Sequence, residues 1–253
     1  MPYERRMLGA QCCSNPPKLN PSSGAGHFEK FGGLNTYVTG PAYSSPALLL
    51  VSDIYGYEAP NLRKLADKIA AAGFYVVVPD FFYGDPYNPD NVEKPLPVWI
   101  TDHGVGKGFE DAKPVIEALR RKGVSAIGAA GFCWGAKVVV QLAKPHFIQA
   151  AVLLHPSLVA VDDIKGVEVP MAVLGAEIDR YSPPVLLKQF EEVLAAKVDV
   201  YLKIFPSTAH GWTVRYDVED QNAVKSAEEA HRDMLEWFTK YVKRGTALMN
   251  SRL

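Results

Sequence analysis

Cysteine is scarce in this chain of 253 residues, which contains only Cys12, Cys13 and Cys133. Adjacent cysteines such as Cys12 and Cys13 rarely bond to each other, and any single disulfide would leave one thiol over. Because small secreted scaffolds carry a dense, even set of cysteines, we expect instead a reduced, cytoplasmic protein. Cys12 and Cys13 could ligate a metal, but no Cys or His stands near them at the spacing of a zinc site. We therefore predict no metal.

An excess of charge of one sign is also missing. Lys and Arg number 27 against 28 Asp and Glu, which gives a net charge of −1, and no long run carries a single sign. Nucleic acids and anionic membranes attract basic surfaces, so neither is expected as a partner. No apolar run approaches the roughly 18 residues of a membrane span. The two arginines near the N-terminus precede no apolar segment, so we expect no signal peptide.

Apolar residues are abundant, at 48% of the chain, and fall into short buried runs separated by amphipathic segments. The runs that predict strands are 34–40, 47–52, 74–79, 124–132, 149–154, 169–174 and 198–205. The segments that predict helices are 61–72, 109–122, 136–143, 183–197 and 218–242, with Pro114 expected in the first turn of its helix or at a kink. This alternation predicts one α/β domain with a mostly parallel sheet and helices on both faces.

Three stretches fall outside this alternation. Residues 1–28 are rich in Pro, Ser, Gly and Asn, which predicts an N-terminal arm on the surface. Residues 81–106 mix prolines with aromatics, which predicts a lid-like insertion in a domain that extends over residues 29–245. Residues 246–253 are expected to form a C-terminal tail.

The tail ends in Ser251-Arg252-Leu253. These three residues resemble the peroxisomal address Ser-Lys-Leu, with Arg in place of Lys. Import into peroxisomes is therefore an alternative to the cytosol.

The pentapeptide Gly-Phe-Cys-Trp-Gly at residues 131–135 lies between a predicted strand and a predicted helix. It matches the nucleophile elbow of α/β-hydrolases, with Cys133 where the motif usually has Ser. A sharp strand-to-helix turn strains the central residue and leaves no room for side chains beside it, which explains the two glycines. The helix N-terminus would favour the thiolate of Cys133. The alternative is a buried structural cysteine.

Polar residues that follow predicted strands are candidates for the rest of the site, because sites in α/β sheets form at the carboxyl ends of strands. They are Asp53, Asp80, Cys133, His155, Asp179 and His210. Hydrolase triads run in the order nucleophile, acid, histidine, which selects Cys133, Asp179 and His210. His210 would hold Cys133 as thiolate and move protons, and Asp179 would orient His210.

Other residues could compete for these roles. His155 precedes the acid in sequence and is followed by Pro, which argues against it as the base. Glu177 is the nearest rival of Asp179, which starts a loop that enters a helix. Asp80 is expected to cap the end of its strand. The remaining histidines, expected on the surface or in loops, are His27, His103, His146 and His231.

An acyl transfer also needs two N–H groups that stabilise the oxyanion. We expect them from Trp134, the residue after the nucleophile, and from Ile54, in the loop after the 47–52 strand. The neighbouring Asp53 could accept the Cys133 proton or hydrogen-bond its thiol. It would then keep the thiol poorly nucleophilic until substrate arrives.

Five motifs fall in a fixed order along the chain. They are residues 52–56 (Ser-Asp-Ile-Tyr-Gly), 78–82 (Val-Pro-Asp-Phe-Phe), 131–135, Asp179 with Pro183, and 209–211 (Ala-His-Gly). Together they resemble the dienelactone hydrolase, or carboxymethylenebutenolidase, family over roughly residues 25–245. The resemblance implies the α/β-hydrolase fold and a Cys-Asp-His triad on Cys133, Asp179 and His210. It also implies an acid at Asp53 that contacts the thiol, oxyanion N–H groups at Ile54 and Trp134, and no cofactor.

The chain departs from the family at three positions. Bacterial members hold the substrate carboxylate with arginines, where this chain has Gly84 and Val214, with Arg215 one residue after Val214. The acid beside the thiol is usually Glu and is here Asp53. The chemistry of the scaffold is expected to persist, while dienelactone itself becomes an uncertain substrate.

The double cysteine and the Asp-Ile-Tyr-Gly loop resemble eukaryotic members, including plant ones, some of which carry the label endo-1,3;1,4-β-glucanase. We predict a cysteine-dependent hydrolase that cleaves a small ester or lactone through a thioester. The substrate pocket is expected at Tyr55, Phe82, Tyr83 and Trp212. The alternatives are a carbohydrate hydrolase of the glucanase type and a small-molecule receptor on the same fold. The sequence predicts neither the natural substrate nor the oligomeric state.

Overall fold

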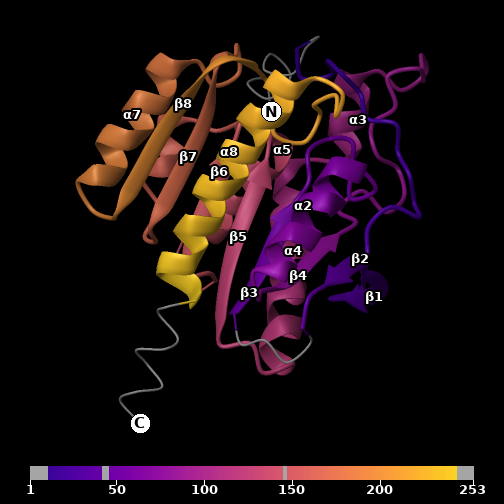
Figure 1. Cartoon of the computed structure of the whole chain (residues 1–253), viewed down its shortest axis with the longest axis horizontal. Coiled ribbons are helices and arrows are strands. Elements are labelled where there is room, and N and C mark those ends of the chain that lie inside the picture. The colour runs from indigo at the N-terminus through magenta and orange to yellow at the C-terminus, as the bar shows by residue number, and fades with distance from the viewer. Residues whose placement is uncertain (1–10, 42–45, 145–146, 244–253) are drawn as a thin grey trace.

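One sheet organises the part of the chain that the computed structural model describes, residues 11–41, 46–144 and 147–243 (Figure 1). Its eight strands lie in the order β1-β2-β4-β3-β5-β6-β7-β8. They are β1 (His27–Phe31), β2 (Leu34–Thr39), β3 (Pro46–Val51), β4 (Tyr75–Pro79), β5 (Ala126–Phe132), β6 (Ala150–Leu154), β7 (Met171–Ile178) and β8 (Val200–Ala209). The pairs along β4-β3-β5-β6-β7-β8 are all parallel. At the other end of the sheet, β1 pairs antiparallel with β2, and β2 pairs antiparallel with β4. The predicted mostly parallel sheet is confirmed.

Helices cover both faces of the sheet, as predicted. They are α2 (Pro60–Ala71), α3 (Leu96–Asp102), α4 (Val105–Arg121), α5 (Trp134–Leu142), α6 (Val161–Ile164), α7 (Pro184–Ala195) and α8 (Gln221–Phe238), which continues into the π-helical turn η1 (Thr239–Lys243). Two apolar clusters fill the space between the layers. One contains residues of α2 and α8, and the other contains residues of α4, α5 and α7. In Figure 1, α2 and α8 lie on the face turned to the viewer.

The central strands are buried on both faces because they lack polar side chains. All seven residues of β5, Ala-Ile-Gly-Ala-Ala-Gly-Phe, are buried. The small side chains let neighbouring layers approach closely: a Cβ on Gly128 would lie 2.7 Å from side-chain atoms of Leu48 and Phe238. This packing fixes the carboxyl end of β5, from which the chain turns into α5.

The structure corrects several local predictions. Helix α4 begins at Val105, so Pro114 lies in its interior and not in its first turn. The short elements β1, α3 and α6 were not predicted, because their sequences have too few residues to show a period. His103 lies in the loop after α3, as expected, and is 9% exposed, whereas His231 lies within α8 and is 3% exposed, although we expected it at the surface or in a loop. His231 bonds the Thr213 carbonyl at 2.8 Å.

His27 is exposed, as expected. His146 and the tail with Ser251-Arg252-Leu253 lie outside the described residues. None of the described helices is both long and apolar enough to cross a membrane.

Candidate active site

Cys133 lies on a sharp turn between β5 and α5. Its φ of 50° and ψ of −109° are backbone angles that residues other than glycine rarely adopt. The flanking glycines are sterically required: a Cβ on Gly131 would lie 2.4 Å from the carbonyl oxygen of Gly135, and one on Gly135 would lie 2.1 Å from that of Val51. The backbone geometry of residues 131–135 is therefore that of a nucleophile elbow.

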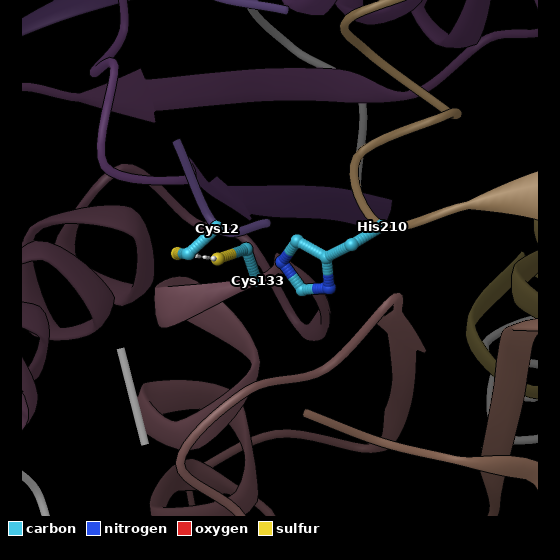
Figure 2. Close-up of side chains that lie close together, drawn as sticks. All are labelled: Cys12, Cys133 and His210. Atoms are coloured by element: carbon cyan, nitrogen blue, oxygen red, sulfur yellow. Dashed lines mark hydrogen bonds between the residues drawn. The ribbon is translucent and has the colours of Figure 1, made fainter. Parts of the chain in front are cut away.

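The three residues of the predicted triad come from three strand ends and meet. His210, directly after β8, donates its Nδ1–H to Oδ2 of Asp179, after β7, at 2.7 Å. Oδ1 of Asp179 also accepts the backbone N–H of Tyr181 at 2.8 Å, and Oδ2 accepts the hydroxyl of Ser182 at 3.1 Å. The Cys133 sulfur lies within 4.8 Å of a His210 ring nitrogen, and the ring is turned towards it (Figure 2). All three side chains are buried.

The charges of this group support one another. Burial disfavours a thiolate, but the hydrogen bond with Cys12 and the charge of His210 prevail and hold the pKa of Cys133 well below its usual value. Burial disfavours the imidazolium too, yet Cys133 and Asp179 raise the pKa of His210 to about 9. For Asp179, the hydrogen bond from His210 overcomes burial and lowers the pKa. The favoured state is therefore a thiolate beside an imidazolium.

A residue that the sequence did not single out for the site lies directly against Cys133. Cys12, in the N-terminal arm, places its sulfur 3.3 Å from the Cys133 sulfur, and both side chains are fully buried. The hydroxyl of Ser157 lies 3.4 Å from the same sulfur of Cys133. More than half of the described arm residues 11–28 are exposed, but Cys12 is buried. No periodicity in residues 1–28 carries a signal for this contact.

Arg215 also lies in the site, although the sequence assigned it no role there. Its Nε donates to Oδ2 of Asp53 at 2.7 Å, and its Nη1 donates to the carbonyls of Cys12 and Ser14 at 2.6 and 3.1 Å. The family pattern has its arginine at Val214, whose side chain is buried apart from these contacts, and the next residue supplies the guanidinium. Gly84, the other such position, lies in a turn with open space at its Cα.

Asp53 lies in the site, but its contacts differ from those expected. One carboxylate oxygen binds Arg215, and the other accepts the backbone N–H of Tyr55 at 2.9 Å. The described hydrogen bonds of the Cys133 sulfur go to Cys12 and Ser157. Burial, only partly offset by Arg215, raises the pKa of Asp53.

The two residues expected to supply oxyanion N–H groups follow neighbouring strands of the sheet. Ile54 follows β3 and is fully buried, while Trp134 is the first residue of α5. The first N–H groups of a helix have no acceptor within it. The strand pairs β3 and β5 are in parallel register up to Val51 and Gly131, which brings both loops to the same edge of the sheet.

The expected pocket residues do not surround one cavity. A cleft of about 740 Å³ beside His210 is lined in part by Trp212, and a smaller one of about 220 Å³ by Tyr55 and Tyr83. The ring of Phe82 packs 4.9 Å from that of Trp134, and Tyr83 is 57% exposed. Of the described residues that line the larger cleft, His210 is the one triad member.

The competing residues have other partners. The Nε2 atom of His155 bonds the Thr213 hydroxyl at 2.7 Å, and the exposed Glu177 accepts the backbone N–H of Ser207 at 2.7 Å. Asp80 accepts the backbone N–H of Phe82 at 3.1 Å, which makes it the cap of its strand end, as predicted.

Within the described part of the chain, one set of side chains could hold a metal ion. The ligand atoms of Cys12, Cys133 and His210 all lie within 4.8 Å of one another, and thiolates with an imidazole suit zinc or copper. The sequence around Cys12 and Cys13 gives no sign of this set, because Cys133 is 121 residues away from Cys12 and His210 is farther still.

Comparison with known proteins places the fold in a family. The family model described as "Dienelactone hydrolase family" matches residues 34–242. The dienelactone hydrolase of Anabaena variabilis superposes with a TM-score of 0.64 at 16% identity, over 90% of this chain and 99% of that one. This structural likeness concerns the fold.

Curated relatives carry two kinds of name. The "Endo-1,3;1,4-beta-D-glucanase" of Zea mays is 41% identical over 197 residues, 76% of this chain. This chain spans 64% of the length of the maize protein. The "Carboxymethylenebutenolidase homolog" of Xenopus tropicalis is 33% identical over 217 residues, which are 83% of this chain and 88% of that protein. The chain is an enzyme of the hydrolase class and belongs to the dienelactone hydrolase family.

Proposed function

We propose that the protein hydrolyses a small carboxylic ester or lactone through a thioester at Cys133. The observation that carries this proposal is the buried Cys133-His210-Asp179 group on a nucleophile elbow. The match to the dienelactone hydrolase family and the carboxymethylenebutenolidase names of relatives support the same bond type.

The first half of the reaction forms the thioester. The Cys133 thiolate attacks the carbonyl carbon, and the resulting oxyanion accepts hydrogen bonds from the backbone N–H groups of Ile54 and Trp134. As the intermediate collapses, the His210 imidazolium gives its Nε2 proton to the leaving alkoxide. The alcohol departs, or remains tethered if the substrate is a lactone.

The second half uses the same groups in reverse. Neutral His210 takes a proton from water, and the hydroxide attacks the thioester carbon. Collapse of the second oxyanion releases the carboxylic acid and restores the thiolate of Cys133. Asp179 keeps Nδ1 protonated, so that Nε2 faces the reacting atoms throughout.

Substrate can reach Cys133 only after the arm moves, because the thiol is fully buried with Cys12 upon it. Movement of the arm also frees the Arg215 Nη1, which the carbonyls of Cys12 and Ser14 now occupy. A carboxylate on the substrate would then have a cation to bind. Asp53 acts on the nucleophile in this scheme through Arg215.

The maize relative's name makes glucan hydrolysis a second candidate. Glycosidases place two carboxyl groups on either side of the sugar bond. Asp53 and Glu58 could be proposed as such a pair, but Asp53 is buried and bound to Arg215, and Glu58 is half-buried outside the triad. The Cys-His-Asp group would have no role in that reaction, so the ester or lactone is preferred.

One set of assays separates these functions. Wild type, Cys133→Ala and Asp53→Asn are tested with p-nitrophenyl acetate, a dienelactone and a mixed-linkage β-glucan. We expect wild type to cleave the ester or lactone and Cys133→Ala to lose that activity. Glucan cleavage that survives Cys133→Ala and is lost in Asp53→Asn would establish the glucanase instead. Saturable binding of a lactone without turnover would indicate a receptor.

A further inference from the structure

The N-terminal arm closes the active site with a specific set of contacts. The side-chain amide of Gln11 donates to the Ile178 carbonyl at 2.8 Å, and the backbone N–H of Arg180 donates back to Gln11 at 2.8 Å. The Tyr55 hydroxyl donates to the Cys13 carbonyl at 2.7 Å. With the two bonds from Arg215, these contacts fix the backbone on both sides of Cys12.

The fixed backbone directs the Cys12 side chain at the nucleophile. Figure 2 shows Cys133 between Cys12 and His210, with the two sulfurs facing each other. The sulfurs are 3.3 Å apart, and both cysteines are free thiols. A disulfide needs a separation of about 2.05 Å, so the sulfurs must approach by little more than 1 Å. Residues 11–26, all described, contain no helix or strand that would resist this shift.

The two thiols differ in the way that thiol oxidation requires. Cys133 stands at the N-terminus of α5, which favours a thiolate, whereas Cys12 lies in the arm outside any helix or strand. A thiolate reacts with peroxides, and a nearby thiol can then resolve the product. Cys133 therefore has the features of the peroxide-reactive sulfur and Cys12 those of the resolving one.

We propose that a hydroperoxide links Cys12 and Cys133 in a reversible disulfide that holds the arm over the active site. The proposal shares with the proposed function the nucleophilicity of Cys133, and it does not require hydrolysis of any ester. This modification would inactivate the enzyme reversibly and would protect its nucleophile from irreversible oxidation.

The chemistry balances in two steps. When the arm has moved, the Cys133 thiolate attacks one oxygen of hydrogen peroxide. An S–O bond forms, the O–O bond breaks, and the second oxygen leaves as hydroxide, which water protonates to give water and a new hydroxide. The Cys12 sulfur then attacks the sulfenic sulfur: the S–S bond forms, the S–O bond breaks, and the departing hydroxide takes the Cys12 proton. The two sulfurs lose two electrons, and the peroxide oxygens are reduced to water and hydroxide. A dithiol reverses the process.

Cys13 provides a matched control, because it is the adjacent thiol in the same arm. Its side chain is half-exposed, and the described thiol–thiol contact is made by Cys12. Both cysteines lie in the same tryptic peptide, residues 7–18, whereas Cys133 lies in the peptide of residues 123–137. Variants Cys12→Ser and Cys13→Ser therefore assign the bond.

The experiment treats the full chain with hydrogen peroxide in the presence of EDTA, which removes any metal bridging the sulfurs. Free thiols are then blocked, and the non-reduced tryptic digest is analysed by mass spectrometry. In wild type and Cys13→Ser, we expect peptides 7–18 and 123–137 joined, with a mass two hydrogens below their sum. In Cys12→Ser, we expect Cys133 as the sulfinic or sulfonic acid.

Esterase activity, normalised to each variant's own starting rate, gives a second readout. After peroxide, wild type and Cys13→Ser should regain more than about half of the lost rate on treatment with dithiothreitol, and Cys12→Ser less than about a tenth. A joined peptide in Cys12→Ser, or equal recovery in all three proteins, would overturn the proposal. The mass readout holds even if the protein cleaves no ester, so failure of the proposed function is recognised separately.

Discussion

The strand ends and the N-terminal arm meet at the Cys133 sulfur, and they are held there in different ways. Asp179 and His210 follow strands whose positions the sheet fixes, and they bond each other directly. The arm has neither helix nor strand over residues 11–26, and side chains of the domain bind its backbone carbonyls instead. The catalytic geometry should therefore persist when the arm is loosened, whereas access to Cys133 should change.

The largest effect is expected from the strand-end group itself. In Asp179→Asn, the amide would donate to His210 and hold the tautomer that cannot accept a proton at Nε2. We expect kcat for a p-nitrophenyl ester to fall by about 10³–10⁴-fold. Glu177→Gln, two residues earlier at the end of β7, is the matched control, and its kcat should change by less than about threefold. A greater loss in Glu177→Gln would mean that the acid is wrongly assigned.

The next effect concerns Arg215, the residue that joins the two regions. Arg215→Met removes two tethers of the arm and leaves the buried Asp53 without its cation. We expect the free energy of unfolding, measured in urea, to fall by about 3–5 kcal/mol. Adding Asp53→Asn should restore part of this loss, because the unpaired charge is removed. Equal stability of the single and double variants would show that charge pairing is not the cause.

A smaller effect is expected at the far end of the arm. Arg63 is fully buried, and its Nη1 lies 2.7 Å from the Pro21 carbonyl and 3.2 Å from that of Ser23. Arg63→Met should lower the free energy of unfolding by about 2 kcal/mol. It should raise the rate of iodoacetamide alkylation at Cys133, with kcat within about threefold of wild type. A loss of kcat similar to that of Asp179→Asn would contradict the separation of the two regions.

The smallest effect is in the pH dependence of alkylation. The lowered pKa of Cys133 keeps its thiolate as the pH falls, and the thiolate is lost only below that pKa. As the pH rises through about 9, His210 loses its proton and the ion pair ends. Between pH 6 and 8 the rate should change less than about threefold, whereas an ordinary thiol loses about tenfold for each unit. In Cys12→Ala, which lacks the hydrogen bond to the Cys133 sulfur, the limb at low pH should move to higher pH.

The sequence predicted the sheet and the strand-end residues because both follow from local patterns. Apolar runs mark the buried strands β3 to β7, and the glycines around Cys133 mark the elbow. The order of polar residues after the strands then singles out Asp179 and His210. Glu177, two residues away, is excluded only by the structure, in which it bonds Ser207.

The arm could not be predicted in the same way. Its contacts use backbone carbonyls, which every residue has, and partners up to 203 positions away. The insertion at residues 81–106 carries the aromatic and proline content expected of a lid, yet its Phe82 packs on Trp134 while Cys12 covers the nucleophile. Arg215 stands one position after the one at which the family pattern has an arginine. Only the structure shows that its side chain enters the site.

The central claim is that Cys133 carries the acyl group during turnover. The most direct test mixes the enzyme with p-nitrophenyl acetate, quenches the reaction in acid within its first turnover, and maps the acyl group by mass spectrometry. We predict one acetyl group on peptide 123–137, at Cys133, and none in Cys133→Ala. Acetylation at another residue during turnover, or full esterase activity of Cys133→Ala, would contradict the account.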